Sequence, residues 1–192
     1  MKNILVEWKG MSPLIMHSCQ GVNPLHPLTI EIKKLTNKKN KTEEDYALLS
    51  DLEWESGLYY DEKVGVYVPA ECIEATVREA AKARKKGKDI VKAFNCLDMI
   101  VPLDIGENLD KEELKADFRF RDVRAMKVMR ARVIRTRPRF NMWRITFNAW
   151  YDESILDLQT IATSMEYAGK YTGLCDSRPK YGQFVPTITE LD

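Results

Sequence analysis

The sequence predicts an α+β fold, and three observations support this prediction. Residues 3–8 and 143–151 alternate between apolar and polar side chains, which is typical of half-buried strands. Residues 69–86 and 158–168 carry apolar side chains at helical spacing. Two further strands are expected, one before residue 138 and one at the C-terminal end. The elements then follow the order strand, helix, two strands, helix, strand. This is the split βαβ, ferredoxin-like or RRM-like, arrangement, an antiparallel sheet with two helices on one face.

The strands of this fold are expected at four places. The first spans residues 3–8, and the last spans residues 184–188. Two more follow Val123 and Pro138, where apolar side chains recur at every second position, with Met129 and Val133 on one face of the earlier strand. We expect these two strands to form an antiparallel hairpin with a basic turn, and the odd positions from 143 to 151 to face the core.

Capping residues and stop signals place the helices. Thr42 and Asp45 form a capping motif that opens a short helix, and Gly57 ends it. Pro69 suits the first turn of the next helix, whose C-terminal lysines are explained by the helix dipole and by solvation. The helix at 158–168 stops at Gly169. Residues 21–41 contain prolines and the polar run KKLTNKKNK, so a basic loop is predicted there.

The size of the chain favours a single domain. Its 192 residues can bury a substantial core. We therefore predict one domain over residues 1–192, with insertions at 21–66 and 88–122 in the basic arrangement.

Composition is that of an ordinary globular protein, 44% hydrophobic and 31% charged. The net charge is only +1, so any argument for nucleic acid rests on how the charge is distributed. The four cysteines are widely spaced and there are two histidines, so we expect no metal, no cofactor and no disulfide. Because the N-terminus lacks a long apolar core and no apolar run approaches about 20 residues, we expect a cytoplasmic protein without a signal peptide.

Two segments carry candidate nucleic-acid contacts. The stretch RVIRTRPRFNMWRITFNAWYD (132–152) contains five arginines, with Phe140 and Trp150 as flat groups on which bases can stack. The loop at 169–184 contains three glycines, the basic residues Arg178 and Lys180, and two tyrosines, which suit a close approach to phosphate. The alternatives are a solvated sheet face for the first segment and an ordered connection after a helix cap for the second.

His17 is a candidate catalytic group. It suits a general base for RNA cleavage, or a partner for Cys19 as a nucleophile. No third group that would orient the pair is evident, and a structural histidine is the more common outcome.

Three segments, in order, resemble the RAMP superfamily, the RNA-binding subunits of CRISPR effector complexes. In YVPAECIEATVREAA (67–81), Pro69, Ala70, Ile73 and Arg78 match the family's helix entry. The segment MSPLIMHS (11–18) is similar to the family's segment after the first strand, and residues 169–184 are similar to its glycine-rich loop. The chain departs from the pattern at Glu74 and Ala75, where the family often has lysine and glycine.

The resemblance implies binding of single-stranded guide-type RNA, with repeated subunits packed along the strand. RNA-cleaving members use an aspartate after the first strand, but no aspartate occurs here before Asp45, so we expect a protein that does not cut RNA. The expected RNA contacts are cations that neutralise phosphates and glycines that let the backbone approach them: Arg78, Arg135, Arg137, Arg139, Arg144, Gly173, Arg178, Lys180 and Gly182.

Other functions stay open. A stand-alone phage or mobile-element protein of this type would bind RNA or single-stranded DNA. A self-assembling protein that sequesters a nucleotide ligand is a second alternative, and a His17-dependent RNA endonuclease is a third.

Overall fold

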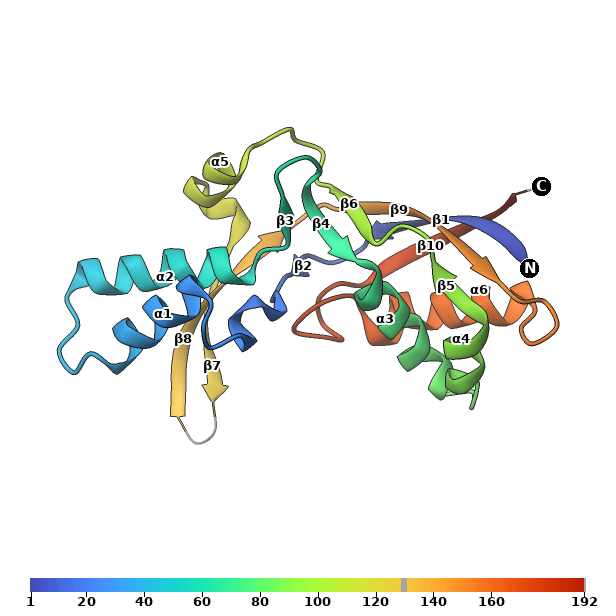
Figure 1. Ribbon diagram of the computed structural model, residues 1–192, viewed down its shortest axis with the longest axis horizontal. Helices are drawn as coiled ribbons and strands as arrows, with labels where there is room; N and C mark the ends of the chain where they lie inside the picture. Colours follow the sequence, from blue (N-terminus) through green and yellow to red (C-terminus); the bar gives the residue numbers. More distant parts are fainter. Residues whose placement is uncertain (129–130, 192) are drawn as a thin grey trace. The chain divides into compact units, whose positions relative to one another are not determined.

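The structure is a computed structural model that describes residues 1–128 and 131–191, and it divides into two compact units (Figure 1). Unit 1 comprises Met1–Leu14, Tyr60–Asn108 and Asn141–Asp192, and unit 2 comprises Ile15–Tyr59 and Leu109–Phe140. The segments 21–66 and 88–122 contribute residues to both units. That they are insertions in a single domain stays a prediction.

Unit 1 is built on one antiparallel sheet. Its strands follow the order β10-β1-β9-β6-β4-β3, and β5 also pairs with β9. The bounds of these strands are β1 (Lys2–Gly10), β3 (Tyr60–Asp61), β4 (Gly65–Pro69), β5 (Phe94–Cys96), β6 (Ile100–Asp104), β9 (Arg144–Tyr151) and β10 (Phe184–Leu191).

The core of this sheet confirms the predicted α+β fold. Strand β1 lies between β10 and β9, with Val6 opposite Ile188 on one side and Phe147 on the other. Strand β6 pairs with the other edge of β9. Helix α3 (Ala70–Lys82) precedes β6 and α6 (Leu158–Tyr167) precedes β10, and the two pack together on one side of the sheet (Figure 1). This is the split βαβ order expected from the sequence.

Alternation along the strands explains why one face of the sheet is covered. Ile4, Val6 and Trp8 are fully buried in β1, whereas the residues between them are less buried. The odd positions of β9 are buried as predicted, and Trp143 before the strand is 4% exposed. Trp8 stacks on Phe184 at the start of β10, with ring centroids 4.0 Å apart. The loop that precedes β10 is therefore anchored in the core.

Two further elements complete unit 1. Helix α4 (Gly87–Ala93) follows α3 and packs against it, and α6 continues into a π-helical turn, η3 (Ala168–Thr172). Apolar side chains of α3 face α6 and η3, with Ile73, Val77 and Ala81 fully buried. The amphipathic pattern predicted for residues 69–86 thus forms the helix that supports the candidate loop.

Unit 2 combines helices with a small antiparallel sheet in the order β2-β8-β7. Its elements are η1 (Cys19–Val22), α1 (Pro27–Asn37), α2 (Glu43–Gly57), α5 (Lys111–Ala116), η2 (Phe118–Phe120), β7 (Arg121–Val128) and β8 (Ala131–Phe140), and β2 (Leu14–Ile15) lies where the two units divide. Helix α2 packs on β8. Buried Trp54 donates its indole N–H to the backbone oxygen of Phe120, 2.8 Å away. The predicted cap of α2 is confirmed, because Thr42 and Asp45 form a reciprocal capping box.

The predicted arginine hairpin is wrong. Strand β8 pairs with β7, whereas β9 pairs with β1, β5 and β6, so the two strands on either side of residues 141–143 belong to different sheets. The strand that pairs with β9 on the side away from β1, a place predicted for the strand before residue 138, is instead β6. Met129 and Arg130, placed in the hairpin by the sequence pattern, lie outside the described residues.

The predicted basic loop at 21–41 is also partly wrong, because α1 occupies Pro27–Asn37. Pro27 stands at the first helical position, where its missing N–H costs nothing. Helix α1 packs against α2, and its partly buried side chains include Leu28, Ile32 and Leu35, at helical spacing, although none is fully buried.

Candidate nucleic-acid interface

The glycine-containing loop of unit 1 folds tightly against its own backbone. The Gly173 N–H donates to the Ala168 oxygen at 2.8 Å, and the Leu174 N–H donates to the Gly182 oxygen at 2.9 Å. The Gly182 N–H in turn reaches the Pro13 oxygen at 2.9 Å, which ties the loop to the end of β1. The two arms of the loop thus lie side by side in a fixed conformation.

This packing requires glycine at two of the predicted site positions. Both Gly173 and Gly182 are buried and have a positive φ, 78° and 71°. A Cβ on Gly182 would lie 2.1 Å from the Leu174 oxygen, and one on Gly173 would lie 2.5 Å from the Tyr181 oxygen. The loop needs both glycines for its own fold, whether or not an RNA lies on it.

The loop and α3 together form a polar depression. It has a volume of about 910 Å³, and Lys82, Tyr171 and Arg178 are among the side chains that line it. Glu79 and Asp176 also line it, so the cations and carboxylates of the depression itself balance. The pKa of Glu79 is lowered mainly because its carboxylate accepts a hydrogen bond from the Lys82 ammonium. The positive charges of Arg178 and Arg78 lower it further. Of the predicted contacts, Arg178 lines this depression, whereas Arg78 lines a neighbouring one formed with α4 and β5.

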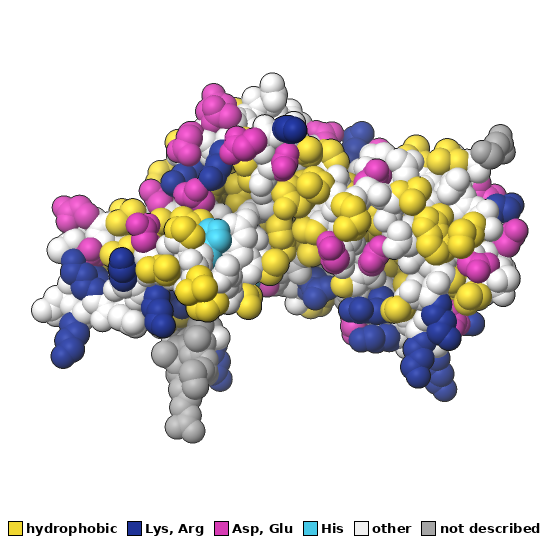
Figure 2. Space-filling view, in the orientation of Figure 1, with side chains coloured by type: hydrophobic (Ala, Val, Ile, Leu, Met, Phe, Trp, Pro, Cys, Tyr) yellow, Lys and Arg dark blue, Asp and Glu magenta, His cyan; other side chains and the backbone are white. Residues whose placement is uncertain are grey.

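Further cations extend this surface. Lys180 is exposed in the loop, and Lys170 is exposed in η3. Lysines and arginines from 82 to 88 are also exposed where α3 ends and α4 begins, and Figure 2 shows dark blue side chains gathered over this part of unit 1. We call residues 78–88 together with residues 167–182 the loop surface.

Aromatic side chains accompany the cations on the loop surface. Tyr167 and Tyr171 are 37% and 54% exposed, and their rings lie 4.8 Å apart. The Lys170 ammonium lies 5.2 Å from the centroid of the Tyr171 ring. Exposed rings next to cations are what single-strand binding requires, because bases stack on the rings while the cations follow the phosphates. Sequence reasoning passed over Tyr167, which is the last residue of α6.

The arginines of β8 are less available than predicted. The Arg135 guanidinium donates to Glu53 at 2.6 Å, and its side chain is 30% exposed. Burial and the neighbouring Arg124 lower the pKa of Arg137, which is only partly exposed. These two side chains lie in unit 2, whereas Arg78, Arg178 and Lys180 lie in unit 1. The predicted contacts are thus divided between the units.

The other predicted residues of the arginine segment differ in how exposed they are. Arg139 is partly exposed at the end of β8, and Arg144 in β9 lies 3.6 Å from Glu7 with 47% of its side chain exposed. Phe140, proposed as a stacking platform, is fully buried, so that prediction is wrong. Trp150 is only partly exposed.

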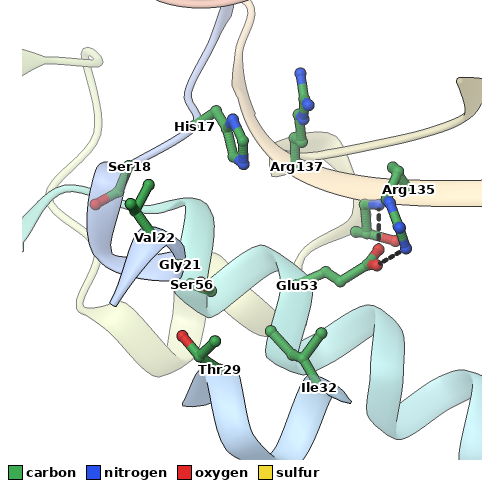
Figure 3. A pocket seen from close by; sticks show the side chains of 11 residues that line it. His17, Ser18, Gly21, Val22, Thr29, Ile32, Glu53, Ser56, Arg135 and Arg137 are labelled. Atoms are coloured by element: carbon green, nitrogen blue, oxygen red, sulfur yellow. Dashed lines mark hydrogen bonds and ion pairs between the residues drawn. The ribbon is translucent and has the colours of Figure 1, made fainter. Parts of the chain in front are cut away.

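His17 lies in a pocket of unit 2 that the sequence did not indicate. Ser18 caps η1, which begins with the exposed Cys19, so His17 and Cys19 do not share a strand face. Burial lowers the pKa of His17, and the charges of Arg137 and Arg135 lower it further. Glu53, from α2, lines the same pocket (Figure 3). No sequence signal joins Glu53 to His17, because the two residues lie far apart in the chain.

Comparison with known proteins identifies the fold. No protein-family model matches the chain. No curated protein matches it. Solved structures do match, among them a chain from the cryo-EM structure of the Type III-B Cmr-beta bound to cognate target RNA.

That match has a TM-score of 0.51 at 13% sequence identity and covers 99% of this chain. The chain spans about three fifths of the length of its counterpart, 61%. The similarity establishes a shared α+β fold. In the part of the chain that the structure describes, no helix combines the length and the apolar character needed to cross a membrane.

Proposed function

We propose that this chain binds single-stranded RNA, without cleaving it, as a subunit of a CRISPR-like ribonucleoprotein. The observation that carries the proposal is the fold similarity over nearly the whole chain to a component of an RNA-bound Type III-B Cmr-beta assembly. The RAMP-like segments at 11–18, 67–81 and 169–184 support it independently, because they come from the residues alone.

The loop surface supplies a chemical reason for RNA binding. Its cations neutralise phosphates, and its exposed tyrosines stack on bases without selecting a sequence. The loop is held rigid by its own hydrogen bonds, so little conformational entropy is lost when a strand binds. A near-neutral chain with a local cationic surface also suits repeated subunits along one strand, because strongly cationic neighbours would repel each other.

Absence of cleavage is part of this proposal. The chain has no aspartate before Asp45, where RNA-cleaving relatives of the RAMP type carry one. Cys19 begins η1 and does not share a strand face with His17, so the two do not form the nucleophile and base that the sequence left open. We therefore assign RNA binding to the loop surface and no catalytic role to His17.

The test removes two loop cations in the variant Arg178→Ala, Lys180→Ala. A single strand loses about 0.7 of its logarithmic salt slope for each phosphate contact removed, so the slope should fall by about 1.4. Affinity for a labelled single-stranded RNA at low salt should fall by about tenfold or more, measured by fluorescence anisotropy. A single-stranded DNA of the same sequence, measured in parallel, tells RNA preference from general single-strand binding.

The matched control is Lys2→Ala, Lys63→Ala, which removes the same charge elsewhere. Lys2 is the first residue of β1, whereas the loop contacts Pro13, beyond the last residue of that strand, and Lys63 follows β3 at the opposite edge of the sheet order. The control should bind RNA nearly as well as the unchanged protein. Equal losses in both variants would show that net charge, and not the loop surface, governs binding.

A further inference from the structure

Unit 2 contains a pocket that the proposed function does not use. It has a volume of about 380 Å³, within the lower range of small-molecule sites, and lies between η1, α1, α2 and β8. Figure 3 shows side chains from these elements around a shared space, with His17 on one side and Glu53 on another. The pocket belongs entirely to unit 2.

The Glu53 carboxylate is fixed in the wall of the pocket. Its Oε1 accepts a hydrogen bond from Arg135 at 2.6 Å, and its Oε2 accepts one from the Thr136 backbone N–H at 2.9 Å. The Glu53 side chain is only 10% exposed. Each carboxylate oxygen has two acceptor positions, so each retains capacity for one more N–H donor. Two neighbouring acceptors are thereby held in place.

The surroundings of the Glu53 carboxylate favour a neutral group with N–H donors over a phosphate. The lining as a whole carries one net positive charge, because Arg135 and Arg137 stand against Glu53. Arg135 is paired with Glu53, and Figure 3 shows Arg137 extending away from Glu53. A phosphate next to Glu53 would meet a carboxylate of the same sign, at a cost in a partly buried site. A neutral group with adjacent donors meets no such repulsion.

The opposite wall provides a flat aromatic group. Burial lowers the pKa of His17, and the nearby Arg137 and Arg135 lower it further, which favours the uncharged imidazole. An uncharged imidazole stacks on a base, as aromatic side chains do in single-strand recognition. Val22 and Ile32 add apolar surface to the lining.

The lining also holds a polar atom without a partner. The Thr29 Oγ1 is buried and makes no hydrogen bond to any of the described residues. A buried hydroxyl in this state is costly, and such groups normally have a partner. The pocket is where a ligand can provide that partner, because Thr29 lines it.

We infer that this pocket binds an unstacked guanine base of a single-stranded RNA. The N1–H and the 2-amino group of guanine are adjacent donors, which match the two oxygens of Glu53. Adenine presents an acceptor at N1, and uracil and cytosine each present a single donor group at this edge. This inference rests on the proposed function, because RNA binding is what would supply the base. A free guanine nucleotide would be recognised by the same contacts.

The first test uses free nucleotides as probes, titrated into the full chain by calorimetry. Guanosine monophosphate should bind, and inosine monophosphate, which lacks the 2-amino group, should bind about tenfold more weakly or worse. Adenosine and uridine monophosphates should not bind measurably. Equal affinities for the guanosine and inosine nucleotides, or no binding by guanosine monophosphate, would overturn the inference.

Variants locate the binding to the named groups. Glu53→Gln should abolish the preference for guanosine over inosine monophosphate. The matched control is Glu55→Gln on the same helix, which loses ion pairs to Lys111 and Lys115 but does not line the pocket. Thr29→Val should weaken guanosine binding without lowering thermal stability, because it removes a hydroxyl that has no partner in the ligand-free protein. Normal guanosine binding by Glu53→Gln would overturn the assignment.

Oligonucleotides separate this inference from the proposed function. An oligouridine with one central guanine should bind more tightly than oligouridine alone, and Glu53→Gln should remove the difference. If both oligonucleotides bind equally and guanosine monophosphate does not bind, the pocket inference fails while RNA binding stands. If guanosine monophosphate binds but neither oligonucleotide does, the proposed function fails and the RNA source of the base with it.

Discussion

At the scale of residues, His17 links the stability of unit 2 to pH. The His17 side chain reaches the surface, but its surroundings desolvate the ring in part, and Arg137 and Arg135 place positive charge nearby, so its pKa in the folded chain lies below the ordinary value of 6.5. The unfolded chain therefore takes up a proton on acidification before the folded chain does. Stability is fully present above the unfolded pKa and falls as the pH drops through 6.5 toward the lower folded value.

The variant His17→Gln removes this proton uptake. Between about pH 7.5 and pH 5, its melting temperature should fall less than that of the unchanged protein. The comparison is made between the two pH values, so a constant effect of the substitution on stability cancels. Thermal unfolding followed by circular dichroism measures it, and an equal or steeper acid loss in the variant would contradict the assigned pKa shift.

The ion pair between Arg135 and Glu53 changes how the arginine segment should be tested. Removing Arg135 would leave a mostly buried carboxylate without its charge partner, so weaker RNA binding by an Arg135→Ala variant would mix a folding effect with a binding effect. Loop residues Arg178 and Lys180 are exposed and avoid this difficulty.

At the scale of elements, the loop at 169–184 depends on glycines that accept a left-handed conformation. Gly182→Ala and Gly65→Ala both place a Cβ at a positive φ, 71° and 81°. That strain costs about 1 kcal/mol in each variant. Only at Gly182 does the added Cβ also meet a backbone atom, the Leu174 oxygen at 2.1 Å, whereas nothing lies within 4 Å at Gly65.

The free energy of unfolding should therefore decrease by about 1 kcal/mol for Gly65→Ala and by more than about 2 kcal/mol for Gly182→Ala. Urea denaturation of both variants measures the difference. Equal losses would mean that the loop backbone is not packed as tightly as its hydrogen bonds indicate.

The elements predicted from sequence are those with strong local signals. Periodicity and caps placed β1, α2, α3, α6 and β10 near their observed positions. Alternation also identified β8 and β9 as strands, but alternation reports only that one face is buried and not which strand lies alongside. Residues 141–143 resemble a hairpin turn in sequence, although β9 pairs with β1, far away in the chain.

Helix α1 was missed for a related reason. Its lysines and the prolines before it are typical of loops, and these signals outweighed the apolar residues Leu28, Ile32 and Leu35, which stand at helical spacing. What holds α1 is its packing against α2, which no local pattern reveals. Among the site residues, the sequence predicted Arg78, Arg178 and Lys180. It did not predict that Glu79 and Tyr171 line the same depression, because these two residues lie far apart in the chain and come together only in the folded unit.

At the scale of the whole molecule, two units divide the predicted RNA contacts. Unit 1 carries the loop surface, and unit 2 carries the pocket of His17 and Glu53. Under the two proposals made above, unit 1 holds the RNA backbone through charge and unit 2 selects a base.

Binding of a labelled single-stranded RNA across a salt series tests the central claim most directly. If Lys82, Arg178 and Lys180 each neutralise one phosphate, the logarithmic salt slope should be about −2, which is a loss of affinity of about twentyfold between 50 and 200 mM salt. Binding that does not weaken with salt, or no binding at low salt, would contradict the assignment of this chain as an RNA-binding subunit.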